Sequence, residues 1–208
     1  MSQSKGIFQN ELFYIDHLNP DSDMDLDLIE MFRVDRPEGY GLEVYLKEYS
    51  CDDEKNKTMR TYLVRYNNTD ELVGYFSLKA GLVSVNETTE IIKDKSTGEE
   101  KEVREFDTVP GVELADFSVN SVFITKHSDL KGVGYYIFTE FVVPTILSAS
   151  DIVGIKFIYI FALPEPGLIE RYGEYGFRRM SEKLETDFHR RLKPRYDQSC
   201  IFMYQLLE

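Results

Sequence analysis

The sequence predicts a mixed α/β (α+β) fold: a central, mostly antiparallel sheet flanked by helices. The first half of the chain contains β-like runs separated by tight turns, which favours antiparallel pairing. A later β–α–β order favours one parallel pair in the same sheet. Of the 208 residues, 42% are hydrophobic and 29% are charged, so the composition is globular and we expect a single domain over residues 1–208.

The first half is expected to combine a hairpin with short helices. A first strand is predicted at residues 11–16, followed by a short acidic helix at 23–32. Apolar side chains recur at helical spacing in residues 41–56, which predicts a second helix. Residues 58–67 and 72–85 alternate like strands on either side of a polar turn, and so form the hairpin.

The second half supplies the β–α–β unit. The aromatic and β-branched run 111–125 predicts a long central strand, and the apolar run 132–149 predicts a buried helix that Pro144 should kink or deprive of one backbone bond. The remaining predicted elements are a buried strand at 155–163, a short helix within 164–177 and a closing strand at 200–207.

The polar segment 86–108 lies between the two halves and contains a Ser-Thr-Gly turn. It is predicted to be either a charged hairpin extension or a flexible loop. We treat it as an insertion that could shape the entrance for a substrate.

Charge and cysteine content narrow the possible partners. The net charge of −13 disfavours a nucleic acid and favours a cationic partner, although it also serves solubility. Cys51 and Cys200 form no close pair, and with three scattered histidines no metal site is expected. No secretory signal and no apolar run of about 18 residues is visible, so we expect a cytoplasmic protein without a membrane span.

Two glycines precede the helix predicted at 132–149. Gly132 and Gly134 would open this helix after a strand and a short loop, where free N–H groups and the helix dipole favour an anion. A tight loop that packs the helix on the sheet explains the glycines equally well. The chain lacks the GxxxxGK[ST] loop and an N-terminal GxGxxG, which argues against a P-loop enzyme and a dinucleotide fold.

A second motif turns this pattern into a family resemblance. The window Asp129-Leu130-Lys131-Gly132-Val133-Gly134 is followed, after one buried strand, by Tyr172-Gly173-Glu174-Tyr175-Gly176-Phe177. Together they resemble the pyrophosphate loop and the Tyr-x-x-x-Gly-Phe motif of the GNAT acetyltransferases, in particular a bacterial subgroup with toxin-like members. The resemblance covers roughly residues 60–180 and implies the GNAT-like acyl-CoA N-acyltransferase fold, with acetyl-CoA as co-substrate and an amine as acceptor.

The resemblance also implies residue roles. Tyr172 corresponds to the tyrosine that protonates the leaving thiolate. Glu113 and Asp116 are the candidate bases on the predicted central strand; a regular strand would point them to opposite faces, so at most one would face the substrate, and Glu113 is favoured. Cofactor contacts are expected from one set of residues before the helix and one at its start: Phe123, Ile124, Lys131, Gly132, Val133, Gly134 and Tyr135. The backbone N–H of Ile124 is the expected oxyanion donor.

Departures from the family pattern keep alternatives open. Asp129 replaces a Gln or Arg, and Glu165 stands where many relatives carry Asn. The leading interpretation is an N-acetyltransferase that acts on a cationic small molecule or protein. There are two alternatives with the same fold: a toxin-type enzyme that acts on aminoacyl-tRNA, and a non-catalytic binding module. A homodimer is a further expectation from the resemblance.

Overall fold

The structure is a computed structural model that describes residues 8–94, 96–182, 185–186 and 199–207. The described residues form an eight-stranded sheet in the order β1-β2-β3-β4-β5-β6-β8-β7. The β5–β6 pair is parallel and the other pairs are antiparallel, which confirms the predicted mixed, mostly antiparallel sheet. The strands are β1 (Phe8–Gln9), β2 (Phe13–His17), β3 (Arg60–Tyr66), β4 (Leu72–Lys93), β5 (Glu100–Val119), β6 (Phe157–Ala162), β7 (Arg178–Arg179) and β8 (Ile201–Leu206).

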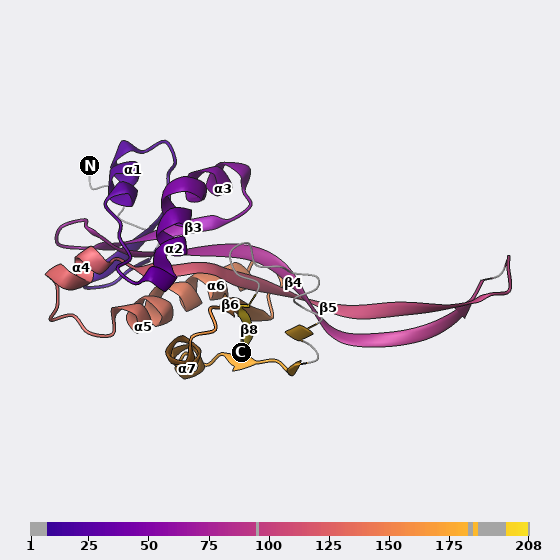
Figure 1. Cartoon of the computed structure of the whole chain (residues 1–208). Helices are drawn as coiled ribbons and strands as arrows, with labels where there is room; N and C mark the ends of the chain where they lie inside the picture. Colours follow the sequence, from indigo (N-terminus) through magenta and orange to yellow (C-terminus); the bar gives the residue numbers. More distant parts are fainter. Residues whose placement is uncertain (1–7, 95, 183–184, 187–198, 208) are drawn as a thin grey trace.

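Helices cover both faces of this sheet (Figure 1). One face carries α1 (Asp23–Glu30), the short turn η1 (Pro37–Gly39), α2 (Tyr40–Val44), the π-helical turn η2 (Tyr45–Tyr49) and α3 (Ser50–Asn56). The other face carries α5 (Val133–Ile137), the π-helical turn η3 (Phe138–Val142) and α6 (Val143–Ser150), which follow α4 (Ser121–Lys126), while α7 (Pro166–Glu174) comes after β6.

The alternation of side chains along β3 divides the core between the two faces. Leu63 packs in the cluster beneath α1–α3, whereas its neighbours Tyr62 and Val64 pack in the larger cluster that contains Ile137 and Phe138. Each face of the sheet is therefore apolar, and this is why helices cover both.

The predicted helix at 132–149 is present as the continuous run Val133–Ser150. Pro144 has no N–H to donate. The π turn η3 ends at Val142, two residues before it, and Val143 donates its N–H to the Phe138 carbonyl five residues back. The local change to π geometry accompanies the proline at the place where the sequence predicts a disturbance.

This run also has the length and composition to cross a membrane, with 18 residues and a mean hydropathy of 1.2. In the sequence it is not an uninterrupted apolar run, because Thr139, Glu140 and Pro144 interrupt it. One such helix is weak support for a membrane span, since a core helix of a soluble protein meets the same criterion, and 39% of this run is buried within the structure.

The segment predicted as hairpin or loop is a hairpin. Strands β4 and β5 stay paired from Asn86 opposite Asp107 to Lys93 opposite Glu100, and they extend far from the rest of the molecule (Figure 1). At the tip, the Asp94 carboxylate accepts the N–H groups of Ser96 and Thr97. We call the paired residues from Ser84–Thr108 outwards the arm.

The central strand is shorter than predicted. β5 ends at Val119, and residues 121–126 form α4 instead of continuing the strand to 125. Asn120 adopts an extended conformation and its side-chain oxygen accepts the Val122 N–H, so it caps the helix. The Asn-Ser pair is a helix-start signal that the aromatic and β-branched character of this run obscured.

Candidate active site

The two parallel strands β5 and β6 separate in the middle of the sheet. They pair only from Gly111 opposite Phe157 to Glu113 opposite Tyr159. Beyond these positions β5 stays beside β4 up to Val119, while β6 stays beside β8 up to Ala162. The facing edges of the two strands therefore offer backbone N–H and C=O groups to whatever lies between them.

A cavity of about 800 Å³ lies at this separation. Its floor comes from the diverging strands, one wall from the α2–η2 segment, and another from α7. The lining residues that matter for chemistry are Glu38, Tyr45, Lys79, Glu113, Asp116 and Tyr172. The mixture of an apolar lining with a few ionisable groups is typical of a small-molecule site.

Tyr172 reaches this cavity from α7, as the sequence predicts for a residue of the active site. Its ring packs edge-on against Tyr175 and Phe177, at centroid distances of 5.9 and 5.6 Å. Burial raises the pKa of Tyr172 above its ordinary value, and the neighbouring Tyr175 and Asp116 add to the rise. The phenol is therefore protonated at neutral pH and can donate a proton.

Glu113 and Asp116 both line the cavity, which corrects the expectation that a regular strand would point them to opposite faces. The strand is not regular: Leu78 pairs with Leu114 and Ser77 with Asp116, so Ala115 is an extra residue in β5. A bulge of this kind shifts the alternation by one residue. As a result, two carboxylates three positions apart reach the same space.

The two carboxylates have different surroundings. Glu113 accepts a hydrogen bond of 3.4 Å from the Tyr159 hydroxyl, and the Lys79 ammonium lies 4.0 Å from the same oxygen. Asp116 is only 6% exposed. Burial raises the pKa of the nearby Tyr45 hydroxyl to about 12, and the negative charge of Asp116 contributes to that rise.

The glycine loop lies at the start of the Val133–Ser150 run. Gly132 has φ of +68°, and a Cβ at this position would meet no atom within 4 Å. Its need for glycine is therefore conformational, and the space in front of it is open. Lys131 and Tyr135 are exposed beside it, whereas the Val133 side chain is buried.

Gly134 faces the sheet rather than the open space. An added Cβ would lie 3.6 Å from the Tyr175 hydroxyl and from Val119 Cγ2, which is ordinary contact. The two explanations of the glycine pair thus apply to different residues. Gly134 lies where the helix packs against the end of β5, and Gly132 forms the open, left-handed entry to the helix.

Phe123 and Ile124 do not lie on the strand edge as predicted. Both are in α4, where the Ile124 N–H is bonded to the Asn120 carbonyl and is not available for an oxyanion. The Phe123 ring is 2% exposed and packs in the core against Phe13 and His127. The part of β5 that lies beside the separation of the strands consists of residues before Asn120, not of Phe123 and Ile124.

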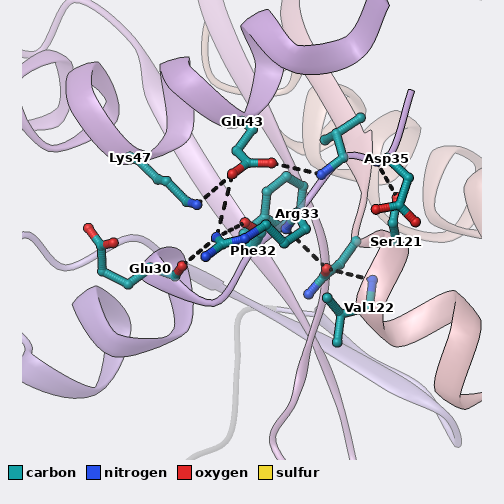
Figure 2. Close-up of polar contacts among 10 residues, drawn as sticks. Glu30, Phe32, Arg33, Asp35, Glu43, Lys47, Ser121 and Val122 are labelled. Atoms are coloured by element: carbon teal, nitrogen blue, oxygen red, sulfur yellow. Dashed lines mark hydrogen bonds and ion pairs between the residues drawn. The ribbon is translucent and has the colours of Figure 1, made fainter. Parts of the chain in front are cut away.

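A short strap of residues 32–36 connects the cavity wall to the end of β5 (Figure 2). Asn120 accepts the Arg33 N–H, and Ser121 donates its N–H to the Arg33 carbonyl and accepts the Asp35 N–H on its hydroxyl. On the other side, Glu43 of α2 accepts the Val34 N–H at 2.9 Å. Through these hydrogen bonds the strap connects α2, and with it one wall of the cavity, to the residues that follow β5.

Glu43 is the anchor of the strap on α2. Its carboxylate also pairs with Lys47 at 2.6 Å and with Arg33 at 3.5 Å. Its pKa is lowered from the usual value because these contacts outweigh the opposing effect of burial, which is the largest single influence. Sequence reasoning did not identify the strap, because its partners are nearly 90 residues apart.

Comparison with protein-family models and with curated proteins finds no match. Solved structures do match. A tyrosine-to-phenylalanine mutant of KacT has 15% identity and a TM-score of 0.61, with 94% of this chain and 95% of that chain covered. AtaTR bound with acetyl-CoA has 19% identity, a TM-score of 0.60 and coverage of 93% and 94%.

A third match is AtaT complexed with acetyl-methionyl-tRNAfMet, at 19% identity, a TM-score of 0.59 and coverage of 91% and 93%. At these identities the similarity establishes the fold. The chain therefore has the GNAT-like fold that the two motifs predict. Within that fold, its solved structural neighbours include bacterial toxins.

Proposed function

We propose that this protein is an acetyl-CoA-dependent N-acetyltransferase that acetylates a primary amine. The observation that carries the proposal is the position of Tyr172, a protonated phenol in the cavity where β5 and β6 separate. The binding of acetyl-CoA to structural neighbours supports the choice of acyl donor.

The chemistry follows from the groups that line the cavity. The neutral amine attacks the thioester carbonyl carbon, a C–N bond forms and the C–S bond breaks. The ammonium proton passes to Glu113, directly or through a water, and the leaving thiolate takes a proton from Tyr172. Lys79 compensates the charge of Glu113, while Asp116 is a second carboxylate within the same cavity.

The acyl donor would be held by backbone groups. The amides of Lys131, Gly132, Val133, Gly134 and Tyr135 are the proposed pyrophosphate contacts, and the open space at Gly132 fits a bulky anion. The free edge of β5 at residues 117–119, rather than Phe123 and Ile124, would bind the pantetheine arm.

Asp129 and Glu165, two of the departures from the family pattern, lie in the loop before Lys131 and at the start of α7. Asp129 is exposed in the loop before Lys131. Glu165 caps α7 through its backbone carbonyl, which accepts the N–H groups of Leu168 and Ile169.

The test is acetyl transfer to a panel of primary amines, measured as thiol release. Tyr172→Phe should lower kcat by about 100-fold or more, because it removes a general acid and little else. Tyr204→Phe makes the same chemical change outside the cavity and should leave kcat unchanged. Equal rates for Tyr172→Phe and the wild type would remove Tyr172 from the mechanism.

Aminoacyl-tRNA is a second candidate acceptor. It is favoured by the AtaT complex with acetyl-methionyl-tRNAfMet and by the exposed side chains of Arg171, Arg178 and Arg179. Two further arginines of the C-terminal segment, Arg190 and Arg191, lie outside the described residues. The net charge of −13 opposes this acceptor, and acetylation of charged tRNA in the same assay would decide between the two.

A non-catalytic module with the same fold is the alternative from a different class. It is distinguished from both enzymes by the absence of acetyl-CoA binding.

A further inference from the structure

The arm begins next to the active-site cavity. Lys79 and Glu113 line the cavity and are also paired across β4 and β5. From this pair the ladder continues outwards to the Ser84–Thr108 pair and then along the arm to the Lys93–Glu100 pair. At about 3.3 Å per residue, the arm adds about 30 Å to the roughly 17 Å between the cavity and its base. Such a track is far longer than a small-molecule acceptor.

The arm is an isolated two-stranded ribbon. β3 pairs with β4 only as far as Leu78, and β6 pairs with β5 only from Gly111 onwards, so both outer edges of the arm lack a neighbouring strand among the described residues. Two-stranded ribbons are marginally stable in water by themselves, and open edges readily accept a further strand.

The tip of the arm also presents apolar side chains. Ile91 is 71% exposed and Ile92 is 46% exposed, in a part of the arm whose other described side chains are polar. Exposed isoleucines on an open ribbon indicate a surface that gains stability when another chain covers it.

The charge of the arm indicates which kind of chain could cover it. Residues 86–108 contain eight acidic and four basic residues, a net charge of −4. The cavity continues this bias, with Glu38, Glu113 and Asp116 against Lys79. A nucleic acid is repelled by this arrangement, and so is a second copy of a chain with a net charge of −13. A basic polypeptide is attracted along the whole track.

We propose that the arm docks a basic polypeptide acceptor in an extended conformation, so that a primary amine of that polypeptide enters the cavity. The inference rests on the proposed acetyltransferase function and deepens it by naming the acceptor class. The arm would act through binding and not through chemistry, so its loss should change KM and leave kcat unaltered.

The test uses the full-length protein and an arm-shortened variant. In this variant Asn-Gly replaces Thr89–Arg104, so that the register pair Thr88–Glu105 flanks a two-residue turn. The acceptors are an N-terminally blocked peptide of about 15 residues, which spans about 50 Å when extended, with a single lysine at one end and arginines along the rest; a peptide with serines in place of the arginines; and n-butylamine.

A second variant separates charge from length. Glu90→Gln, Glu99→Gln and Glu100→Gln neutralise three exposed acids of the arm. The matched control, Asp23→Asn, Asp27→Asn and Glu30→Gln, makes the same charge change on α1, at the other end of the molecule from the arm (Figure 1).

Arm shortening should raise KM for the arginine-flanked peptide about tenfold, with kcat and the n-butylamine kinetics within twofold of the wild type. The arm charge variant should raise the same KM at low salt, the α1 control should not, and the difference should shrink at high salt. An unchanged KM for the basic peptide in the arm-shortened variant would overturn the inference, as would arm-dependent acetylation of aminoacyl-tRNA.

Direct binding keeps this test separate from the proposed function. If the wild type acetylates no amine, the proposed function fails, but fluorescence anisotropy of the labelled basic peptide still measures docking. Weaker binding to the arm-shortened variant would then support a docking arm, and equal binding to both proteins would reject it.

Discussion

Replacing Asn120 with alanine removes the side chain that joins the end of β5 to the strap and to α4. Asn120 is 5% exposed and makes three side-chain contacts: its amide donates to the Leu72 carbonyl at 2.9 Å, and its oxygen accepts the N–H groups of Arg33 at 3.3 Å and Val122 at 3.1 Å. We predict that Asn120→Ala lowers the free energy of unfolding by about 3 kcal/mol.

This magnitude is the sum of two effects. The lost helix cap accounts for about 1 kcal/mol. The buried Leu72 carbonyl and the partly buried Arg33 N–H lose their partner, at a cost of roughly 1 kcal/mol each.

The assay is urea unfolding followed by circular dichroism, with Asn68→Ala as the control. Asn68 is exposed and its amide donates only to the exposed hydroxyl of Tyr66, so its replacement should cost less than about 0.5 kcal/mol. If Asn120→Ala lost no more than the control, the strap would not depend on Asn120 and the argument from its contacts would fail.

Three further predictions concern catalysis, pH and packing. Because burial raises the pKa of Tyr172, kcat should show no alkaline decline from this group up to about pH 10, as a pH–rate profile would reveal; a decline centred near pH 8 would contradict its protonated state. The pKa of Glu71 is lowered to about 2, chiefly by the hydrogen bond from Lys126. The stability that the ionised Glu71 adds to the fold is therefore present above the unfolded pKa of about 4.5 and is lost as pH falls towards 2; because the pair is largely exposed, it is worth about 1 kcal/mol. Urea titrations of Glu71→Gln at several pH values should lack this part of the acid destabilisation. Gly74→Ala would place a Cβ 2.6 Å from the Ser118 carbonyl in the β4–β5 ladder and should lower the free energy of unfolding by about 1–3 kcal/mol, whereas a thermal melt identical to the wild type would show that the strands can move apart without cost.

The family motifs were a reliable guide because they depend on local backbone requirements. Gly132 adopts a left-handed conformation at the start of a helix, and Tyr172 follows a strand whose end lies at the cavity. Both features depend on only a few neighbouring residues, so a short stretch of sequence is enough to predict them. The β3–β4 hairpin and the parallel β5–β6 pair follow for the same reason, since the hairpin and the β–α–β unit have local turn and periodicity patterns.

The errors arose where distant parts of the chain decide the structure. The length of β5 was overestimated because aromatic and β-branched residues continue past Asn120, where contacts with Arg33 and Leu72 support a helix cap instead. The shared direction of Glu113 and Asp116 depends on a bulge at Ala115, which is set by pairing with β4. Periodicity within one strand does not reveal a shift imposed by its neighbour.

Glu113 and Asp116 are both within reach of the cavity, so single Glu113→Gln and Asp116→Asn variants are needed to identify the base. Their expected difference lies in kcat, because the base acts on the reacting amine.

Calorimetric titration with acetyl-CoA tests the central claim most directly, with free CoA as the control for binding without the acetyl group. The account predicts binding in the micromolar range, on the order of −8 kcal/mol. A Gly132→Val variant, which forces a β-branched residue into a left-handed conformation, should bind at least tenfold more weakly. An absence of heat with millimolar acetyl-CoA would contradict the acetyltransferase account and leave the binding-module alternative.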